Sequence, residues 1–233
     1  MNQANYVVVG GSRGIGLGIV KRLVVRGASV TVLSRTSDEL NFDGVRHVPF
    51  DVLNDGVPQD AMPATIDGLA YCPGSINLGP LRGVKADVML ADYQLNVIGA
   101  VKCVQAAMAG MKAAQRSSVV MFSTVAVQQG LPMHSVVAAS KGALEGLTRT
   151  WAAELAPHSR VNCIAPSLTD TPLAERLLSS DEKREAMGKR HPLGRVGTID
   201  DIAAMAEFLL TDASSWVTGQ VFGVDGGMSS LRA

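Results

Sequence analysis

The sequence predicts an α/β fold: a doubly wound, seven-stranded parallel sheet with helices on both faces, in one domain that spans residues 1–233. Short β-rich runs alternate along the chain with segments of helical periodicity, which is the pattern of βαβ units. Several of these runs are nearly continuous apolar stretches, as strands covered on both faces should be. No internal repeat, linker or low-complexity tract divides the chain.

The strands and helices follow from these runs in chain order. The first predicted helix carries Ile15, Ile19 and Leu23 on one apolar stripe. The connection over residues 51–67 is rich in glycine and proline, and leaves room for one helical turn or an irregular path. The predicted strands are Tyr6–Val9, Ser29–Leu33, Val45–Phe50, Gly68–Cys72, Ser118–Phe122, Arg160–Ile164 and Gln220–Val224. The predicted helices are Gly14–Arg26, Asp87–Ala114, Ser135–Leu155, Asp181–Lys189 and Ile199–Leu210.

The composition is typical of a folded, soluble protein. Hydrophobic residues make up 47% and charged residues 18%, which is enough apolar surface for a core and too little charge for disorder. The 21 basic and 21 acidic residues balance, so charge offers no case for a nucleic-acid or membrane partner. No basic n-region precedes the first apolar run, and no run approaches the ~18 apolar residues of a membrane span. We therefore expect a cytoplasmic protein.

The cysteines give no sign of a disulfide framework or a metal site. Cys72, Cys103 and Cys163 are widely spaced in apolar surroundings and form no Cys-x-x-Cys pair. This pattern favours buried free thiols in a reducing compartment. The sequence therefore predicts no bound metal.

A glycine-rich turn follows the first predicted strand at once. Such a turn into a helix lets backbone N–H groups approach a pyrophosphate at the helix N-terminus. Glycine is needed where a Cβ would block that approach or where the backbone needs a positive φ. The sequence therefore predicts a Rossmann-type dinucleotide site. Its expected contacts in this turn are Gly10, Ser12, Arg13, Gly14, Ile15 and Gly16.

The end of the second predicted strand favours NADP(H) over NAD(H). An NAD site typically has an acidic residue about 20 residues after the glycines, which binds the ribose 2′-hydroxyl. Here Ser34 takes that position and Arg35 follows it. Arginine pairs with a 2′-phosphate that a carboxylate would repel, and Arg13 in the glycine turn adds a second cation. The alternative is that both arginines are solvated surface side chains.

Motifs along almost the whole chain resemble the short-chain dehydrogenase/reductase family. The glycine turn has the family spacing G-x-x-x-G-x-G, and Ala138-Ala139-Ser140-Lys141 fits the family's active-site helix. The closing Val224-Asp225-Gly226-Gly227 looks like that of the 3-oxoacyl-carrier-protein reductase type.

The resemblance implies further contacts to the dinucleotide. Asp51 and Val52 match the pair that holds the adenine in the family, and Gly74 matches the last residue of the family's Asn-Asn-Ala-Gly. The other positions of that tetrapeptide differ, so its asparagine contacts are missing. The segment that lines the nicotinamide contains Pro166, Thr169 and Thr171, with Ser167 in place of a glycine.

The same resemblance implies a catalytic set of Asn, Ser, Tyr and Lys. Asn96 matches the residue that anchors a water linked to the lysine, and Lys141 matches the lysine that binds the nicotinamide ribose. Thr124 takes the serine position, and its hydroxyl can still polarise a carbonyl. Val137 takes the position of the tyrosine, which is the family's proton donor and acceptor. A valine has no proton to give.

His134 is the candidate substitute for the missing acid. It precedes Val137 by one helical turn, so His134, Val137 and Lys141 share a face if the helix has begun there. Histidine donates protons readily near neutral pH. The alternatives are a loop histidine at the start of the helix, with Ser135 as the N-cap, and a water positioned by Thr124.

These observations predict an NADP(H)-dependent short-chain oxidoreductase that reduces a carbonyl, or oxidises an alcohol, of a small or acyl substrate. General acid–base catalysis contributes ~10²–10⁴-fold, so losing the tyrosine predicts a slow enzyme and not necessarily a dead one. A non-catalytic NADP(H)-binding sensor or structural partner is one alternative, and a lyase or isomerase on the same fold is another. Residues 173–190 are the predicted substrate lid. The resemblance also implies a homotetramer or homodimer, built on the helices predicted over residues 87–114 and 135–155.

Overall fold

The computed structural model describes residues 3–37 and 39–232, and its core is one parallel sheet. Seven strands pair in the order β3-β2-β1-β4-β5-β6-β7, which confirms the predicted doubly wound fold. The order turns back between β1 and β4, so the crevice of this fold type opens above their carboxyl ends. The strands are β1 (Asn5–Val9), β2 (Ser29–Ser34), β3 (Val45–Pro49), β4 (Gly68–Tyr71), β5 (Ser117–Phe122), β6 (Ser159–Pro166) and β7 (Val221–Val224).

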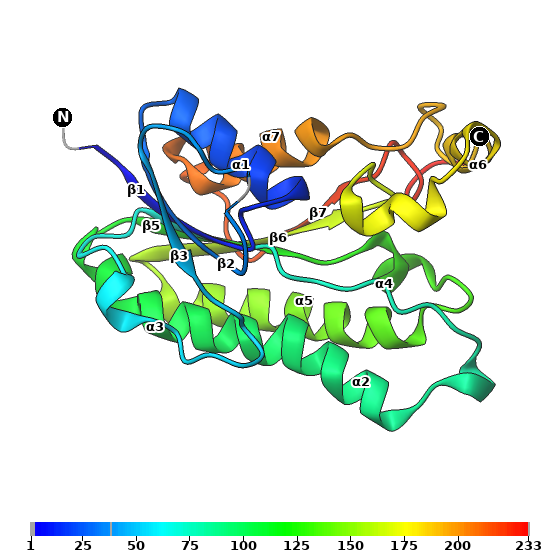
Figure 1. Cartoon of the computed structure of the whole chain (residues 1–233), viewed down its shortest axis with the longest axis horizontal. Coiled ribbons are helices and arrows are strands. Elements are labelled where there is room, and N and C mark those ends of the chain that lie inside the picture. The colour runs from blue at the N-terminus through cyan, green and yellow to red at the C-terminus, as the bar shows by residue number, and fades with distance from the viewer. Residues whose placement is uncertain (1–2, 38, 233) are drawn as a thin grey trace.

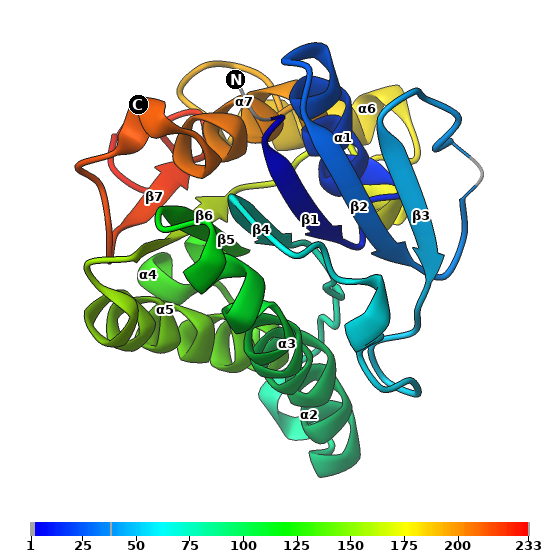
Figure 2. The same ribbon diagram turned by 90° about the vertical axis from the view of Figure 1, so that its left-hand side faces the viewer.

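Helices cover both faces of this sheet, as Figures 1 and 2 show. On one face lie α1 (Gly14–Val25) and α7 (Ile199–Leu210). On the other lie α2 (Ala86–Tyr93), α3 (Gly99–Ala113) and α5 (Ser135–Leu155). The short α4 (Val125–Gln129) follows β5, and α6 (Asp181–Gly188) lies beyond the carboxyl ends of the strands.

Alternating side chains of the strands build one hydrophobic core on each face. In β1, Val7 and Val9 face the α3 and α5 side, whereas Tyr6 and Val8 face the α1 and α7 side. All four are less than a tenth exposed, so this strand is buried on both faces. The nearly continuous apolar runs in the sequence therefore form strands covered on both faces, as predicted.

The helix predicted over Asp87–Ala114 is interrupted by one wide π turn, Gln94–Ile98, between α2 and α3. The Gly99 N–H bonds to the carbonyl of Gln94, five residues back, and not to that of Leu95. The hydroxyl of Tyr71 at the end of β4 donates to the Leu95 carbonyl instead. The helical path continues through this turn from Ala86 to Ala113, so the predicted helix is present with one local change of hydrogen bonding.

The remaining connections are short and irregular. The path from β3 to β4 holds a single 3₁₀ turn, Gln59–Ala61, as its glycines and prolines predict. The predicted lid folds as a 3₁₀ segment, Pro172–Leu177, followed by α6, whose N-terminus is capped by Ser180. Among the described residues, no helix is long and apolar enough to cross a membrane.

Candidate active site

The glycine turn between β1 and α1 forms a tight backbone cradle. A Cβ on Gly16 would stand 2.3 Å from the carbonyl oxygen of Gly10, and Gly14 has a φ of +54°. The N-cap of α1 is Arg13, with no side-chain cap and no acidic residue in the first turn. The first N–H groups of α1 therefore face the turn without a side-chain acceptor, and this geometry fits a pyrophosphate.

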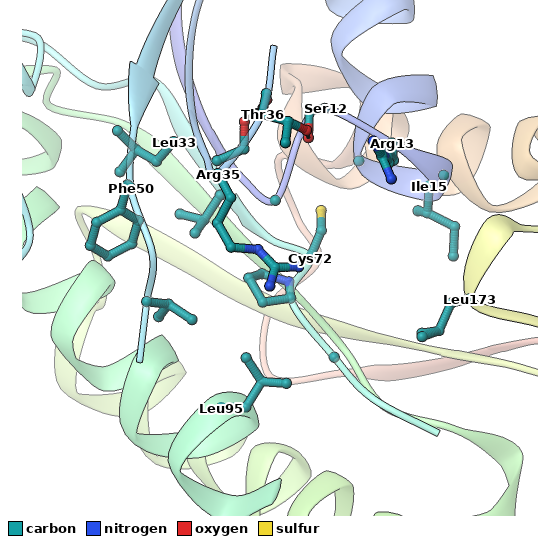
Figure 3. A pocket seen from close by; sticks show the side chains of 18 of the residues that line it. Ser12, Arg13, Ile15, Leu33, Arg35, Thr36, Phe50, Cys72, Leu95 and Leu173 are labelled. Carbon is teal, nitrogen blue, oxygen red and sulfur yellow. Dashed lines mark hydrogen bonds between the residues drawn. The ribbon is translucent and has the colours of Figure 1, made fainter. Parts of the chain in front are cut away.

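A cavity of about 430 Å³ opens over this cradle and over the carboxyl ends of β2, β3 and β4. Figure 3 shows Arg35 extending from the end of β2 over the cavity, with Arg13 and Ile15 on the α1 side and Leu173 on the lid side. The sequence analysis missed the apolar part of the lining, which includes Leu33, Phe50 and Leu95. Of the predicted cofactor residues, the lining contains Gly10, Ser12, Arg13, Gly14, Ile15, Gly16, Ser34, Arg35, Asp51, Val52, Gly74 and Thr171.

The edge of this cavity at β2 carries the features expected for a 2′-phosphate. The Ser34 hydroxyl donates to the carbonyl of Thr36 at 2.8 Å and thereby fixes the turn that presents Arg35. Among the described residues of the lining, the only carboxylate is that of Asp51, whose oxygens accept from Leu53 N and Asn54 Nδ2 at 3.0 Å. The residues present therefore fit NADP(H), with the glycine turn for the pyrophosphate and Arg35 for the phosphate.

A second cavity of about 520 Å³, here called the chamber, continues from the first. The two share Ile15, Cys72, Gly74, Thr171 and Leu173, so they form one connected hollow. The chamber walls bring together residues from α5, from the ends of β5 and β6, and from the lid. The predicted site residues among them are Thr124, His134, Lys141, Pro166, Thr169 and Thr171, and Val137 lies with them.

Lys141 and Asn96 meet at Gly74. A Cβ on Gly74 would lie 3.3 Å from the Lys141 Nζ and 3.5 Å from the Asn96 Oδ1, so the glycine leaves room for both groups. Burial lowers the pKa of Lys141 to about 8, against the opposing charge of Asp92. Asn96 donates from Nδ2 to the Asp92 carbonyl at 2.9 Å, whereas its buried Oδ1 has no partner among the described residues. An unpartnered buried amide oxygen beside a lysine is suited to hold a water.

Thr124 caps α4 at the chamber wall. Its Oγ1 accepts from the N–H of Ala126 at 3.3 Å, so its hydroxyl proton can point to a substrate oxygen. The neighbouring Ser123 is committed elsewhere, because its hydroxyl donates to Glu145 at 2.6 Å. This difference is consistent with the choice of Thr124 over Ser123 from the sequence.

Comparisons with known proteins agree with this geometry. The family model described as enoyl-(acyl carrier protein) reductase matches residues 9–229. L-Xylulose reductase of Bos taurus is 34% identical over 230 residues, which cover 95% of this chain and 94% of the relative. The chain belongs to the short-chain dehydrogenase/reductase family.

Two further matches bear on what the site can do. A gluconate 5-dehydrogenase from Burkholderia cenocepacia, solved in complex with NADP and tartrate, superposes with a TM-score of 0.89 at 27% identity. That match covers 100% of this chain and 97% of the other. The inactive 2-(S)-hydroxypropyl-CoM dehydrogenase 2 of Xanthobacter autotrophicus is 35% identical over 171 residues, 71% of this chain and 74% of the relative. The family's reductases and dehydrogenases interconvert carbonyl and alcohol groups, and this chain shares their fold.

Val137, the residue that the sequence predicts at the family's tyrosine position, has a buried apolar side chain. Val137 is 7% exposed, lies one turn before Lys141 on α5, and lines the chamber. The chain's three tyrosines are Tyr6, Tyr71 and Tyr93, and none lines the described chamber. The described chamber therefore offers no tyrosine hydroxyl as a proton donor.

Two histidines line the chamber, and the sequence analysis named one of them. His134 is the N-cap of α5, so the helix begins one residue later than a shared helical face requires, and Ser135 is not the cap. The Nδ1 of His134 lies 2.7 Å from the Pro132 carbonyl at the edge of the chamber. The second is His191, which contacts Ser167. Nothing in the sequence pairs His191 with Ser167, which lies at a position where the resemblance implies a glycine.

Proposed function

We propose that this protein is a cytoplasmic NADP(H)-dependent oxidoreductase that reduces a carbonyl, or oxidises an alcohol, at an active site without the family tyrosine. The observation that carries the proposal is the connected hollow, in which a pyrophosphate cradle leads to Thr124 and Lys141. Arg35 and Arg13 support the preference for NADP(H), because both line the end of the hollow where the 2′-phosphate would be read. The three unpaired cysteines are consistent with a reducing compartment.

Bound NADPH supplies hydride transfer to the substrate carbon. The residues of this chain hold the cofactor and the substrate and handle the proton. Lys141 would bind the nicotinamide ribose, with Pro166, Thr169 and Thr171 along the nicotinamide. The Thr124 hydroxyl donates a hydrogen bond to the substrate oxygen and stabilises the charge that develops there. Asn96 anchors a water next to Lys141.

The chamber favours a substrate with an apolar body and no positive charge. Its walls include apolar lid residues such as Leu173, Leu177 and Met187. Its charged or titratable side chains are Lys141, His134, Arg190, His191 and the thiol of Cys72, and the described lining contains no carboxylate. Small ketones, and acyl substrates of the type that the closing motif of the chain suggests, fit this combination.

A non-catalytic NADP(H)-binding protein is the second candidate. The buried Val137 favours it, because a valine cannot transfer a proton at any pH. The similarity to a relative named as inactive is in line with this candidate. Such a protein binds NADPH tightly and shows no turnover.

The proposal includes a homodimer or homotetramer. Apolar side chains stand exposed on α2 and α3, including Leu90, which is 66% exposed, and Met108, which is 44% exposed. A contact between copies would cover them. Light scattering on the purified protein should give a mass of two or four chains, and a monomer would contradict this part.

The function is tested by NADPH oxidation with a panel of ketones, quinones and 3-oxoacyl thioesters. Turnover with at least one class, and weaker turnover with NADH, is the expected result. Tight NADPH binding without oxidation across the panel would favour the binding protein. Product formation without a net change in NADPH would indicate a lyase or isomerase.

A further inference from the structure

His191 is a buried histidine whose ring is held at both nitrogens. It is 4% exposed and lies just beyond α6. Its Nδ1 lies 2.9 Å from the Met187 carbonyl, and its Nε2 lies 2.8 Å from the Oγ of Ser167. A carbonyl only accepts hydrogen bonds, so Nδ1 carries a proton in either charge state. The Nε2 is then the nitrogen that exchanges a proton, and it faces Ser167.

Ser167 stands next to the centre of the proposed reaction. In the pairing of β5 with β6, Phe122 is opposite Ile164, and the Ser123 N–H continues the ladder to the Ile164 carbonyl at 2.7 Å. Thr124 is therefore level with Pro166, the residue before Ser167. Neighbouring strands are about 4.8 Å apart, so Thr124 and Ser167, which both carry a hydroxyl, lie at the ends of adjacent strands. Both residues, together with His191, line the chamber.

The second contact of Ser167 shows where its proton can go. Its Oγ also lies 3.0 Å from the sulfur of Met228, which lines the same chamber. When the imidazole is charged, the His191 Nε2–H donates to the Ser167 Oγ, and the hydroxyl proton is left to point toward the sulfur. A thioether is a weak acceptor. A substrate oxygen in the chamber is a stronger acceptor and would replace the sulfur as the partner of that proton.

We propose that Ser167 is the catalytic proton donor that replaces the family tyrosine. His191 is the positioning residue that holds the Ser167 hydroxyl and returns a proton to it. This inference rests on the proposed reductase function. As the carbonyl carbon receives hydride, the Ser167 O–H bond breaks and its proton moves to the substrate oxygen. The electron pair left on Oγ takes up the Nε2 proton of the imidazolium, which becomes neutral and keeps its Nδ1 proton. Solvent then protonates Nε2 again, so one proton and one hydride are consumed per alcohol formed.

The groups that face His191 include a carboxylate. Asp225, beyond the end of β7, lines a small cavity together with His191. Burial opposes the ionisation of Asp225, but hydrogen bonds from Ser229 and Gly227 and the nearby His191 hold its pKa below the usual value. The other charged or titratable groups of the two described cavities are Arg190, Lys141, His134, Cys72 and the ion pair of Arg195 with Asp201, whose atoms lie 2.6 Å apart.

The other hydroxyl and histidine of the chamber are less suited to the same role. Thr124 can polarise a carbonyl, but its Oγ1 contacts only the Ala126 N–H, so no titratable group stands behind it to restore its proton. His134 lies at the entrance to α5, half-buried, with no hydroxyl between its ring and the chamber. The Ser167–His191 pair combines a hydroxyl in the chamber with a buried titratable ring behind it.

The test is the reduction rate of Ser167→Ala and His191→Gln with the best substrate of the wild type. We expect kcat to fall by ~10²-fold or more in both, the usual range for loss of a general acid. The matched control is His158→Gln, at an exposed histidine after α5, which should keep the wild-type rate. The wild-type rate of reduction should fall with rising pH, because the step consumes a proton held by the imidazole, and this dependence should vanish in His191→Gln.

A tyrosine at position 137 separates a proton donor from a structural role. Adding Val137→Tyr to Ser167→Ala or His191→Gln supplies a phenol, so both double variants should regain the rate of Val137→Tyr alone. A structural defect would not be rescued in this way. Wild-type kcat in Ser167→Ala, or failure of the rescue, would overturn the proton donor while leaving the reductase function standing. A wild type that binds NADPH and never oxidises it would overturn both.

The tautomer of His191 can be read without any substrate. The ¹⁵N NMR signals of the His191 ring are assigned as those that disappear in His191→Gln. In the cofactor-free protein at high pH, these signals should show a protonated Nδ1 and an unprotonated Nε2. A bare Nδ1 with a protonated Nε2 would contradict the proposed direction of the relay.

Discussion

The cofactor cavity and the chamber lie side by side at the carboxyl ends of the same strands, but they depend on different parts of the chain. The cofactor cavity is shaped largely by backbone, in a turn where Gly16 approaches the Gly10 carbonyl too closely for any side chain. The chamber depends on side chains, and it includes Val137, the residue predicted at the family's tyrosine position. On our proposal, one region keeps the family pattern and the other departs from it. The comparison teaches that binding of the dinucleotide and transfer of the proton can change independently in this fold.

Closing the backbone cradle should have the largest effect. Gly16→Ala places a Cβ 2.3 Å from the Gly10 oxygen, so the turn must shift and NADPH binding should weaken by about 3 kcal/mol or more, over 100-fold. Isothermal titration with NADPH measures this loss. Gly146→Ala in α5 is the matched control, because nothing lies within 4 Å of its new Cβ. Unchanged affinity in Gly16→Ala would mean that the cradle does not hold the cofactor.

Burial of Lys141 should appear in the pH dependence of stability. Its pKa is lowered by burial from 10.5 to about 8 in the folded chain, so between these values the unfolded state binds the proton and the folded state does not. Stability should therefore rise with pH across this window, by on the order of 3 kcal/mol. Urea unfolding of the cofactor-free protein at pH 7 to 10, with Lys141→Met alongside, isolates this contribution. A constant difference between the two proteins would show that Lys141 keeps its ordinary pKa.

Reversing the charge at Arg35 tests the cofactor preference. A hydrogen bond to a charged group contributes about 1.5–3 kcal/mol, so Arg35→Asp should weaken NADPH binding by ~10–100-fold and leave NADH binding nearly unchanged. Arg82→Asp, at an exposed arginine, is the control for the change in net charge. Equal losses for both dinucleotides would remove Arg35 from the 2′-phosphate site.

The smallest of these effects concerns the polarising hydroxyl. Thr124→Val keeps the side-chain shape but removes the cap of α4, which should cost about 1 kcal/mol of stability, and it should lower kcat by ~10-fold or more. Thr124→Ser should retain both properties. Thermal unfolding and steady-state reduction measure the two effects separately. Loss of stability alone would assign Thr124 to capping and not to the reaction.

The sequence predicted the sheet and the cofactor cavity because both depend on local patterns. Apolar runs mark strands buried on both faces, and glycine spacing marks the cradle. The Ser167–His191 contact could not be predicted, because it joins residues 24 positions apart in the sequence. Ser167 directly follows β6, whereas His191 follows the predicted lid. The π turn that contains Asn96 also carries a long-range contact, from the Tyr71 hydroxyl to the Leu95 carbonyl. Long-range pairing of polar side chains leaves no periodicity in the sequence.

The central claim is that the chamber is a working reductase site that lacks its usual acid. The most direct measurement is the rate of NADPH oxidation by the wild type and by Val137→Tyr, side by side on the best substrate of the panel. The account predicts slow but measurable turnover in the wild type and a rate at least tenfold higher in Val137→Tyr, since a phenol is restored one turn before Lys141. A tyrosine variant that is no faster than a wild type with measurable turnover would contradict it.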